Sequence, residues 1–382
     1  MRLLFVTSSF ARFDGDPTAA AGLGVYQLVR ELGKHVSGTV ITPAQEGAPE
    51  TERLGGMVVQ RIAPERPPGA LHQSNHPSHL LRAYRVDRAM KRTARFLAPL
   101  HDVAHGHWAF PGGAAVTRLD IPSAVVCLGT DVHRYSYMPV FKSMFKNVVT
   151  RASANIAMDA GAQARIEEVS GRETYCIPNA VPLESIPLAE PASGKQIAWV
   201  GRMSPEKGPD VMVRAFALAY ARDPELRLTM MGDGALMGSI RALARSLGVA
   251  DAVEFRGAVH NQQVLENYAD AAVVVVSSRS EGLPASSLEA LAMGRPVVAT
   301  DVGGLRKLLS GGGGITVPSD DPPALSDAIV QAVGRSWEPR FLRTQVEHAS
   351  VAAVTRTYLD IYEEIIAKYP RKLFERAGSA PV

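Results

Sequence analysis

The chain has 382 residues, of which 46% are hydrophobic and 21% charged, and its formal net charge is +3. These values are typical of a globular protein with two or three domains, and they exclude a disordered, collagen-like or disulfide-stabilised class. So small a charge also argues against a nucleic-acid partner, which requires a strongly basic face.

Short runs rich in β-branched residues recur along the chain, and stretches with helical periodicity lie between them. This alternation predicts parallel sheets that are covered by helices on both faces. The expected strands are Leu3–Ser8, Gly38–Thr42, Met57–Ile62, Asp102–Ala104, Ser123–Leu128, Asn155–Ala157, Thr174–Ile177, Gln196–Val200, Leu226–Met231, Val253–Phe255, Ala272–Ser277, Val297–Ala299 and Ile315–Val317. The expected helices include Asp210–Ala221 and Leu236–Leu247.

Residues 182–195 contain three prolines among residues of mixed polarity, which is typical of a linker. The alternation of strands and helices restarts after this segment. We therefore predict two Rossmann-like domains, at residues 1–182 and 195–340, with a cleft between them. Residues 341–382 are expected to form a C-terminal helical segment and tail.

No apolar run is long enough for a membrane-spanning helix, which needs about 20 residues. The N-terminal segment, residues 1–7, is too short and becomes polar too soon for a signal peptide. Cys127 and Cys176 both lie in apolar stretches and are expected to be inert, buried thiols. The sequence therefore predicts a cytoplasmic protein.

A first cluster of chemically useful residues lies at 200–208, between a strand and a helix. Arg202 and Lys207 can converge there on one anion, above the carboxyl end of the sheet, where open α/β folds bind ligands. Arginine can offer a phosphate two parallel hydrogen bonds, and lysine a point charge. A solvated loop with an Arg–Glu pair would show the same pattern.

A second cluster, Glu281 to Glu289, follows the most apolar strand. Pro284 suits the first turn of a helix, whose free N–H groups are an anion site. The two carboxylates can accept hydrogen bonds from sugar hydroxyls. Glycine pairs at 232 and 234 and at 303 and 304 would let the backbone approach a ligand, or would serve as plain tight turns.

In combination, these segments resemble the retaining nucleotide-sugar glycosyltransferases of family 4, which have the GT-B fold. The resemblance runs from Val6 to about Ala328. The segments that carry it are Gly201-Arg202, Glu206-Lys207-Gly208, Gly232-Asp233-Gly234, Phe255-Arg256-Gly257, Glu281 with Glu289, Gly294 to Thr300, and Gly303-Gly304. It implies two Rossmann-like domains that face a deep cleft, with C-terminal helices crossing back to the first domain.

The resemblance also implies roles for individual residues. Arg202 and Lys207 would hold the donor diphosphate, Glu281 would contact the donor sugar, and Glu289 would contact the ribose. The implied donor-site residues are Gly22, Gly24, Arg202, Lys207, Gly257, Val259, Glu281, Gly282, Leu283 and Glu289. The implied catalytic residues are Glu281, Arg202, Lys207, His107 and Asp131. His105–Trp108 and Gly129–His133 resemble loops that face the cleft, and Gly22–Gly24 resembles a glycine-rich loop beside the donor.

Three positions depart from the family pattern. Leu128 stands where a histidine often contacts the donor sugar, and His107 or Asp131 could take its place. Lys307 replaces a frequent glutamate, a change that the sequence does not explain. Ser277 stands where proline is common, which we interpret as harmless.

The resemblance implies a metal-independent hexosyl transfer from a nucleoside diphosphate sugar to a glycan or lipid-linked glycan, with no further cofactor, in bacterial envelope or exopolysaccharide synthesis. The alternatives are a non-hydrolysing sugar epimerase or a phosphorylase of the same architecture, and a non-catalytic glycan-binding relative. An NAD-dependent oxidoreductase is disfavoured, because Gly22 and Gly24 lack the third glycine of the dinucleotide fingerprint and lie too far from the first strand.

Two further patterns in the first half remain. Asp14 and Asp16 form an Asp-x-Asp pair that binds a metal in another fold, although no matching ligands accompany it here. Basic residues also recur every three or four positions with apolar residues between them. They are Arg82, Arg85, Arg88, Lys91, Arg92 and Arg95 with Tyr84, Met90 and Phe96, followed by a similar stretch at 138–151. These stretches predict either solvated helices with an apolar core stripe or helices that lie on an anionic bilayer.

Overall fold

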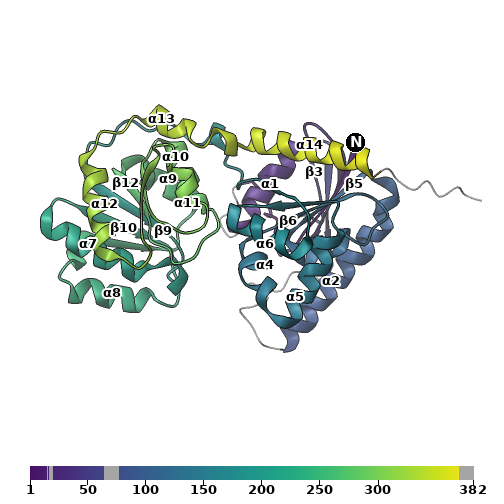
Figure 1. Cartoon of the computed structure of the whole chain (residues 1–382), viewed down its shortest axis with the longest axis horizontal. Coiled ribbons are helices and arrows are strands. Elements are labelled where there is room, and N and C mark those ends of the chain that lie inside the picture. Colours follow the sequence, from purple (N-terminus) through teal and green to yellow (C-terminus); the bar gives the residue numbers. More distant parts are fainter. Residues whose placement is uncertain (15, 17–19, 64–76, 370–382) are drawn as a thin grey trace, which may run out of the picture. The chain divides into compact units, whose positions relative to one another are not determined.

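The computed structural model describes residues 1–14, 16, 20–63 and 77–369 (Figure 1). Contacts divide the chain into two compact units. The first comprises residues 1–157, 163–175 and the chain from 355 onward, and the second comprises residues 158–162 and 176–354. The chain therefore passes between the units more than once.

The first unit is built on a sheet with the strand order β3-β4-β2-β1-β5-β6-β7-β8 among the described residues. Its strands are β1 (Arg2–Thr7), β2 (Ser37–Pro43), β3 (Thr51–Leu54), β4 (Met57–Ile62), β5 (Val103–His107), β6 (Ser123–Cys127), β7 (Ala154–Ala157) and β8 (Thr174–Cys176). Its α-helices are α1 (Ala20–Leu32), α2 (Pro77–Leu97), α3 (Ala114–Val116), α4 (Gly129–His133), α5 (Pro139–Arg151) and most of α6 (Ala160–Ser170).

Strand β3 is absent from the sequence-based prediction. It pairs antiparallel with β4 through a tight turn at Gly55, whose φ is +59°. Only four residues long and with Glu52 and Arg53 at its centre, β3 offers too short an apolar pattern to be recognised.

The last helix, α14 (Val351–Lys368), begins in the second unit and belongs to the first from Thr355 onward. Tyr358 and Tyr362 are buried against His105 of strand β5, and the Tyr362 hydroxyl lies 2.6 Å from His105 Nδ1. The expected return of the C-terminal helix to the first domain is therefore confirmed.

The second unit is built on a parallel sheet with the order β11-β10-β9-β12-β13-β14. Its strands are β9 (Gln196–Val200), β10 (Arg227–Met231), β11 (Val253–Gly257), β12 (Val273–Val276), β13 (Val297–Thr300) and β14 (Gly314–Val317). Its α-helices are α7 (Pro209–Arg222), α8 (Met237–Ser246), α9 (Asn261–Asp270), α10 (Ala285–Met293), α11 (Leu305–Leu309), α12 (Pro322–Gly334) and α13 (Pro339–Thr344).

The burial of strand β12 is typical of a parallel sheet. Val273 and Val275 pack into one apolar core, whereas Val274 and Val276 pack into another on the opposite face. A strand that is buried on both faces needs apolar residues at every position, which is the pattern of a parallel sheet covered by helices. Each of the two units is thus an α/β domain of the predicted class.

Two expectations about smaller features need correction or refinement. Cys127 is buried, as expected, but Cys176 is exposed at the end of the short strand β8. The proline-rich linker is not detached from the core, because Leu183 and Ile186 are buried against the second sheet.

Among the described residues, no helix combines the length and the apolarity that crossing a bilayer requires.

Candidate functional site

The two chemically rich segments meet at one edge of the second sheet. Strands β9 and β12 are parallel neighbours, with Ile197 paired to Val273. Their carboxyl ends therefore lie side by side, and the segments that follow them, 201–208 and 277–284, share the same edge. The sequence-based prediction that both segments serve one site is consistent with this register.

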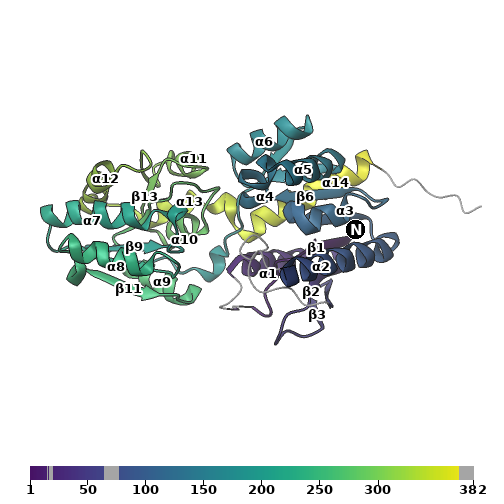
Figure 2. The same ribbon diagram turned by 90° about the horizontal axis from the view of Figure 1, so that it is seen from below.

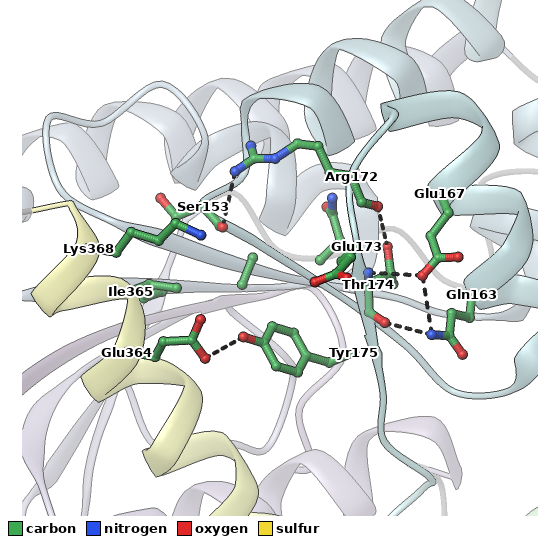
Figure 3. Close-up of a pocket in the computed structure, with 12 residues that line it drawn as sticks. Ser153, Gln163, Glu167, Arg172, Glu173, Thr174, Tyr175, Glu364, Ile365 and Lys368 are labelled. Carbon is green, nitrogen blue, oxygen red and sulfur yellow. Dashed lines mark hydrogen bonds between the residues drawn. The ribbon is translucent and has the colours of Figure 1, made fainter.

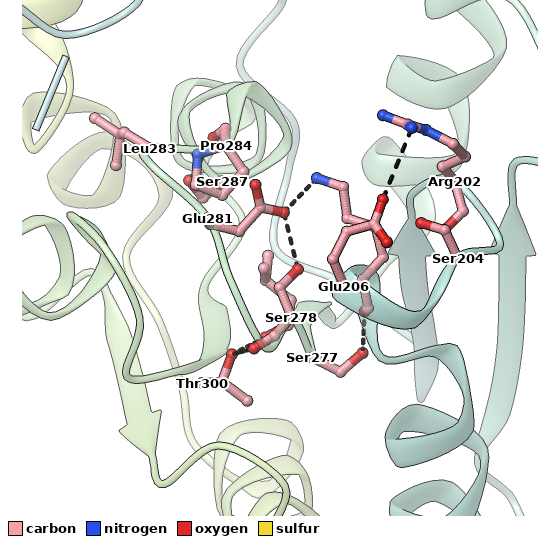
Figure 4. Close-up of polar contacts among 12 residues, drawn as sticks. Arg202, Ser204, Glu206, Ser277, Ser278, Glu281, Leu283, Pro284, Ser287 and Thr300 are labelled. Carbon is pink, nitrogen blue, oxygen red and sulfur yellow. Dashed lines mark hydrogen bonds and ion pairs between the residues drawn. The ribbon is translucent and has the colours of Figure 1, made fainter. Parts of the chain in front are cut away.

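An ion pair joins the two segments. The Lys207 ammonium contacts Oε1 of Glu281, and the Ser278 hydroxyl donates a hydrogen bond of 2.8 Å to the same oxygen (Figure 4). Only 24% of the Lys207 side chain and 12% of the Glu281 side chain are exposed. A largely buried carboxylate is therefore stabilised by a cation and a hydroxyl, as a buried charge requires.

Ser277 fixes the backbone beneath this pair. Its hydroxyl accepts a hydrogen bond from the Trp199 indole at 2.9 Å and lies 2.8 Å from the carbonyl oxygen of Gly208. Gly208 has a φ of +60°, and a Cβ there would lie 2.1 Å from the carbonyl oxygen of Ser277. Only glycine fits this position. Ser277, a departure from the family pattern, thus contributes directly to the contact between the segments.

Arg279 forms a second link that the sequence did not reveal. Its guanidinium makes two hydrogen bonds, of 2.7 and 2.9 Å, to the Asp210 carboxylate and another of 2.7 Å to the carbonyl oxygen of Pro205. The arginine lowers the pKa of the Asp210 carboxyl below its ordinary value. This bidentate geometry holds the start of α7 against the segment that carries Glu281.

The Glu281 segment is also fixed from its other side. Gly303 has a φ of +57°, and a Cβ there would lie 2.2 Å from the carbonyl oxygens of both Glu281 and Gly282. The Asn179 amide donates a hydrogen bond of 3.1 Å to the carbonyl oxygen of Leu283. The glycine pair therefore lets the two backbone segments approach closely. The backbone that would face a donor is held from two directions.

Asp159 also contacts the Glu281 segment, and the sequence analysis did not identify it. Its Oδ1 accepts a hydrogen bond of 2.9 Å from the Ala162 N–H group near the start of α6. Its Oδ2 lies against Gly282, 2.9 Å from the position that a Cβ would take. The signal available was the helix-capping pattern of Asp159 before an alanine-rich helix.

Helix α10 follows the Glu281 segment, and its start is the position of the predicted anion site. It begins at Ala285 after Pro284, and no side chain caps its first turn. Glu289 lies within this helix and accepts a hydrogen bond of 3.0 Å from Asn261. Burial raises the pKa of the Glu289 carboxyl to about 7, and a hydrogen bond from a hydroxyl would favour its charged form.

The other predicted donor-site residues of this unit lie at or after the ends of strands β9 and β11, which β10 separates in the sheet. Arg202 is 57% exposed and pairs with Glu206 at 3.7 Å, so the Arg–Glu pair considered from the sequence is present (Figure 4). Gly257 ends β11 with a φ of +68°, and Val259 packs against the core two residues later. Lys307 is exposed on α11, and nothing in the structure explains its replacement of glutamate.

In the first unit, two predicted loops are regular structure instead. His105 and His107 belong to strand β5, and both are buried against Phe5. Burial lowers the pKa of His107 to about 4 and that of His105 well below its ordinary value. The loop prediction was wrong because apolar neighbours can cover two neutral imidazoles on one strand face.

Gly22 and Gly24 lie within helix α1, so the glycine-rich loop expected there is helical. Gly22 packs against the chain at Phe10, where a Cβ would lie 2.8 Å from the carbonyl carbon. Gly24 is exposed and has open space around it. The structure thus gives a packing reason for the first glycine.

Asp131 is a buried carboxyl at the start of the short helix α4. It accepts a hydrogen bond of 2.7 Å from the Ala109 N–H group, and burial raises its pKa to about 7. Trp108 precedes this contact with a φ of +72°, and its buried indole N–H has no hydrogen-bond partner among the described residues. Strained backbone of this kind concentrates at functional sites.

The Asp-x-Asp pair does not form a shared carboxylate site. Asp14 pairs with Arg30, and Asp16 accepts hydrogen bonds of 2.8 and 2.9 Å from the Arg12 guanidinium. No cluster of three or more potential metal ligands occurs in the described part of the chain.

A polar cavity of about 390 Å³ lies within the first unit, where β7 and β8 begin (Figure 3). Tyr175 donates a hydrogen bond of 2.5 Å to Glu364 of helix α14, and Gln163 donates one of 2.9 Å to the carbonyl oxygen of Thr174. Cations and carboxylates line this cavity together. None of the predicted site residues does.

Comparisons with known proteins identify the family. Residues 21–185 match the model of the Glycosyltransferase Family 4, and residues 194–335 match the model of the Glycosyl transferases group 1. The chain belongs to the family 4 glycosyltransferases, and its two parallel-sheet domains are those of the GT-B fold. The protein is therefore a glycosyltransferase.

Individual relatives agree with this assignment. The D-inositol 3-phosphate glycosyltransferase of Acidothermus cellulolyticus is 37% identical over 204 residues, a match that covers 50% of this chain but only 44% of that protein. The protein of the same name from Nocardiopsis dassonvillei is 27% identical, with 93% of this chain and 91% of that protein covered.

A solved structure shows the same fold at low sequence identity. Anabaena HepE in complex with UDP is 17% identical, has a TM-score of 0.73, and is matched over 95% of this chain and 100% of that chain. HepE has also been solved in complex with UDP-glucose.

The packing of Gly303 leads to a first prediction. We expect Gly303→Ala to displace the Glu281 segment and to weaken nucleotide binding about tenfold or more, because an added Cβ would collide with two carbonyl oxygens. Isothermal titration with UDP, GDP and ADP measures the effect. Gly248→Ala is the matched control, since Gly248 has a φ of +72° but open space around it. Equal affinities for the two variants would contradict the proposed support.

The burial of Asp131 leads to a second prediction. Its folded pKa of about 7 exceeds the ordinary 3.8, so the folded state binds the proton more tightly and stability falls as pH rises from about 4 to 7. Asp131→Asn should therefore be more stable than the wild type at about pH 8, by roughly 4 kcal/mol, because each pKa unit corresponds to about 1.4 kcal/mol. That advantage should shrink toward about pH 4.

Denaturant unfolding across this pH range measures the difference. Asp120→Asn, at an exposed position of the same unit, is the control and should follow the wild type. A stability difference between Asp131→Asn and the wild type that does not vary with pH would contradict the account of Asp131.

Proposed function

We propose that this glycosyltransferase moves a sugar from a nucleoside diphosphate sugar to a hydroxyl of a glycan or lipid-linked glycan, with retention of anomeric configuration and without a metal ion. The observation that carries the proposal is the Lys207–Glu281 pair beside the start of α10. The pair would supply a cation for the diphosphate and a carboxylate for sugar hydroxyls, and the first turn of α10, which no side chain caps, would supply backbone N–H groups.

The donor would bind by partner exchange, in which two cations leave their carboxylates for the diphosphate. Lys207 is paired with Glu281 and Arg202 with Glu206, so each cation already has a carboxylate. A diphosphate would draw both cations to its oxygens, because it carries more negative charge than either carboxylate. Glu281 would then be free to accept hydrogen bonds from the donor sugar, and Glu289 from the ribose.

The transfer step follows from where charge develops. The bond between the anomeric carbon and the diphosphate oxygen breaks, and its electron pair leaves with the nucleoside diphosphate. The acceptor oxygen forms its new bond on the same face of the sugar, and its proton passes to an oxygen of the departing phosphate. Lys207, Arg202 and the start of α10 would stabilise the departing negative charge, a task that other enzymes give to a metal ion.

Known proteins offer limited further support. HepE binds UDP and UDP-glucose, so UDP-sugars are the first donors to test. The names of two relatives specify D-inositol 3-phosphate, so a small phosphorylated polyol is tested as an acceptor beside glycans. A role in envelope or exopolysaccharide synthesis remains part of the proposal.

The test is donor hydrolysis by purified protein with UDP-, GDP- and ADP-sugars, in the presence and absence of EDTA. We expect slow release of nucleotide from one donor, unaffected by EDTA and reduced about 10²- to 10³-fold in Lys207→Ala, since one preorganised contact to the departing charge is worth about 3 kcal/mol. The product of transfer to an acceptor should keep the donor's anomeric configuration in NMR spectra.

Lys195→Ala is the matched control, because Lys195 precedes the same strand β9 at its other end and pairs there with Asp223. It should retain full activity. Lys207→Ala with wild-type turnover would refute the donor site. Binding of a nucleotide sugar without any turnover or transfer would favour a non-catalytic relative instead.

A further inference from the structure

Helix α2 (Pro77–Leu97) has a buried face that accounts for its place in the fold. Val86, Met90 and Ala94 are at most 5% exposed and recur every four residues. This stripe packs toward β1 and β2 of the first sheet. The apolar core stripe expected from the sequence is therefore present, and it includes Met90.

The opposite face of the same helix also carries apolar side chains, and they are uncovered among the described residues. Leu81 is 52% exposed, Tyr84 59% and Phe96 78%. Steps of three and four residues place these side chains on one stripe with Arg85, Arg88, Arg92 and Arg95. Tyr84 and Phe96 point away from the core of this unit, so packing in the core does not account for an apolar side chain at either position.

The four arginines on this stripe are open to solvent. None of them forms an ion pair among the described residues. They are Arg85, Arg88, Arg92 and Arg95, and all four are exposed. The acid on the described part of the helix, Asp87, is paired with Lys91, whose ammonium donates a hydrogen bond of 2.7 Å to Asp87 Oδ2. The exposed face therefore carries a positive charge that a partner can use.

Helix α5 (Pro139–Arg151) extends the surface. The connections from β4 to β5 and from β6 to β7 run in the same direction along the sheet, so right-handed crossovers place α2 and α5 on one side of it (Figures 1 and 2). Met144 is 43% exposed on α5, and Lys142 and Lys146 flank it in the sequence. We call the exposed residues of both helices the α2/α5 surface.

We propose that the α2/α5 surface docks the enzyme on an anionic lipid bilayer. Arginine and lysine would pair with lipid phosphates, and Tyr84, Phe96 and Met144 would enter the interfacial region, where aromatic and apolar side chains lose their contact with water. A soluble polyanion would use the cations but would leave the aromatic rings exposed. The proposal concerns the first unit alone and does not depend on the donor site.

The test is flotation of the purified enzyme with vesicles of phosphatidylcholine alone or mixed with phosphatidylglycerol. We expect binding to the mixed vesicles that decreases with added salt, and little binding to phosphatidylcholine alone. Arg88→Glu combined with Arg92→Glu should weaken binding about thirtyfold or more, since each cation near an anionic surface contributes about fivefold. Donor hydrolysis in solution should be unchanged in this variant.

The matched charge control is Arg214→Glu with Arg245→Glu, at exposed positions on helices α7 and α8, which should bind like the wild type. Tyr84→Ser with Phe96→Ser should weaken vesicle binding but leave retention on heparin unchanged. Leu218→Ser, at a 45% exposed position on α7, is its control and should match the wild type.

Three results would overturn the proposal. The first is that the wild type does not float with anionic vesicles. The second is that the charge-reversal variant of α2 binds as well as the charge-reversal control on α7 and α8. The third is full vesicle binding by Tyr84→Ser with Phe96→Ser. The last result, with heparin retention that requires Arg88 and Arg92, would assign the surface to a soluble polyanion instead.

Discussion

The contact between Lys207 and Glu281 is the constraint on which the rest of the site depends. The two residues are 74 positions apart in sequence, and their charges are largely withdrawn from water. Each would be strongly unfavourable without the other, because an unpaired buried charge costs several kcal/mol, on the order of 3–5. The segments after β9 and β12 must therefore be held in register, and much of the polar structure around them does so.

That support acts mainly on the backbone. Ser277 joins the segments through carbonyl oxygens, and Gly208 and Gly303 permit approaches that a side chain would block. Arg279 adds a bidentate contact to Asp210. Consequently the main chain is fixed while the ends of Lys207, Glu281 and Arg202 can exchange partners. A site of this kind can recognise a charged donor without large rearrangement, which limits the reorganisation that binding requires.

Much of this arrangement could be predicted from the sequence because it follows from periodicity and strand order. Val273–Val276 reads as a doubly buried strand, and the segments after β9 and β12 meet because parallel neighbours end at one edge. The pairing of Lys207 with Glu281 was not predicted, because spacing indicates which edge a residue occupies but not which side chain it touches.

Other features depend on contacts between distant segments and left little trace in the sequence. The bond between Arg279 and Asp210 spans 69 residues, and no local pattern marks it. His105 and His107 were expected in a loop because their segment resembles a cleft-facing loop of the family, yet they lie on strand β5, where Phe5 and helix α14 cover them. The two faces of α2 could not be distinguished by composition, since both contain apolar residues, and only burial separates Met90 from Phe96.

The most direct test of partner exchange is a crystal structure of the enzyme with a bound nucleoside diphosphate sugar. The account predicts that Lys207 Nζ leaves Glu281 and bonds to a diphosphate oxygen, that Glu281 accepts a hydrogen bond from the sugar, and that the backbone of 204–208 and 277–284 stays in place. A donor bound at this sheet edge with the Lys207–Glu281 pair intact, or a donor bound elsewhere, would contradict it.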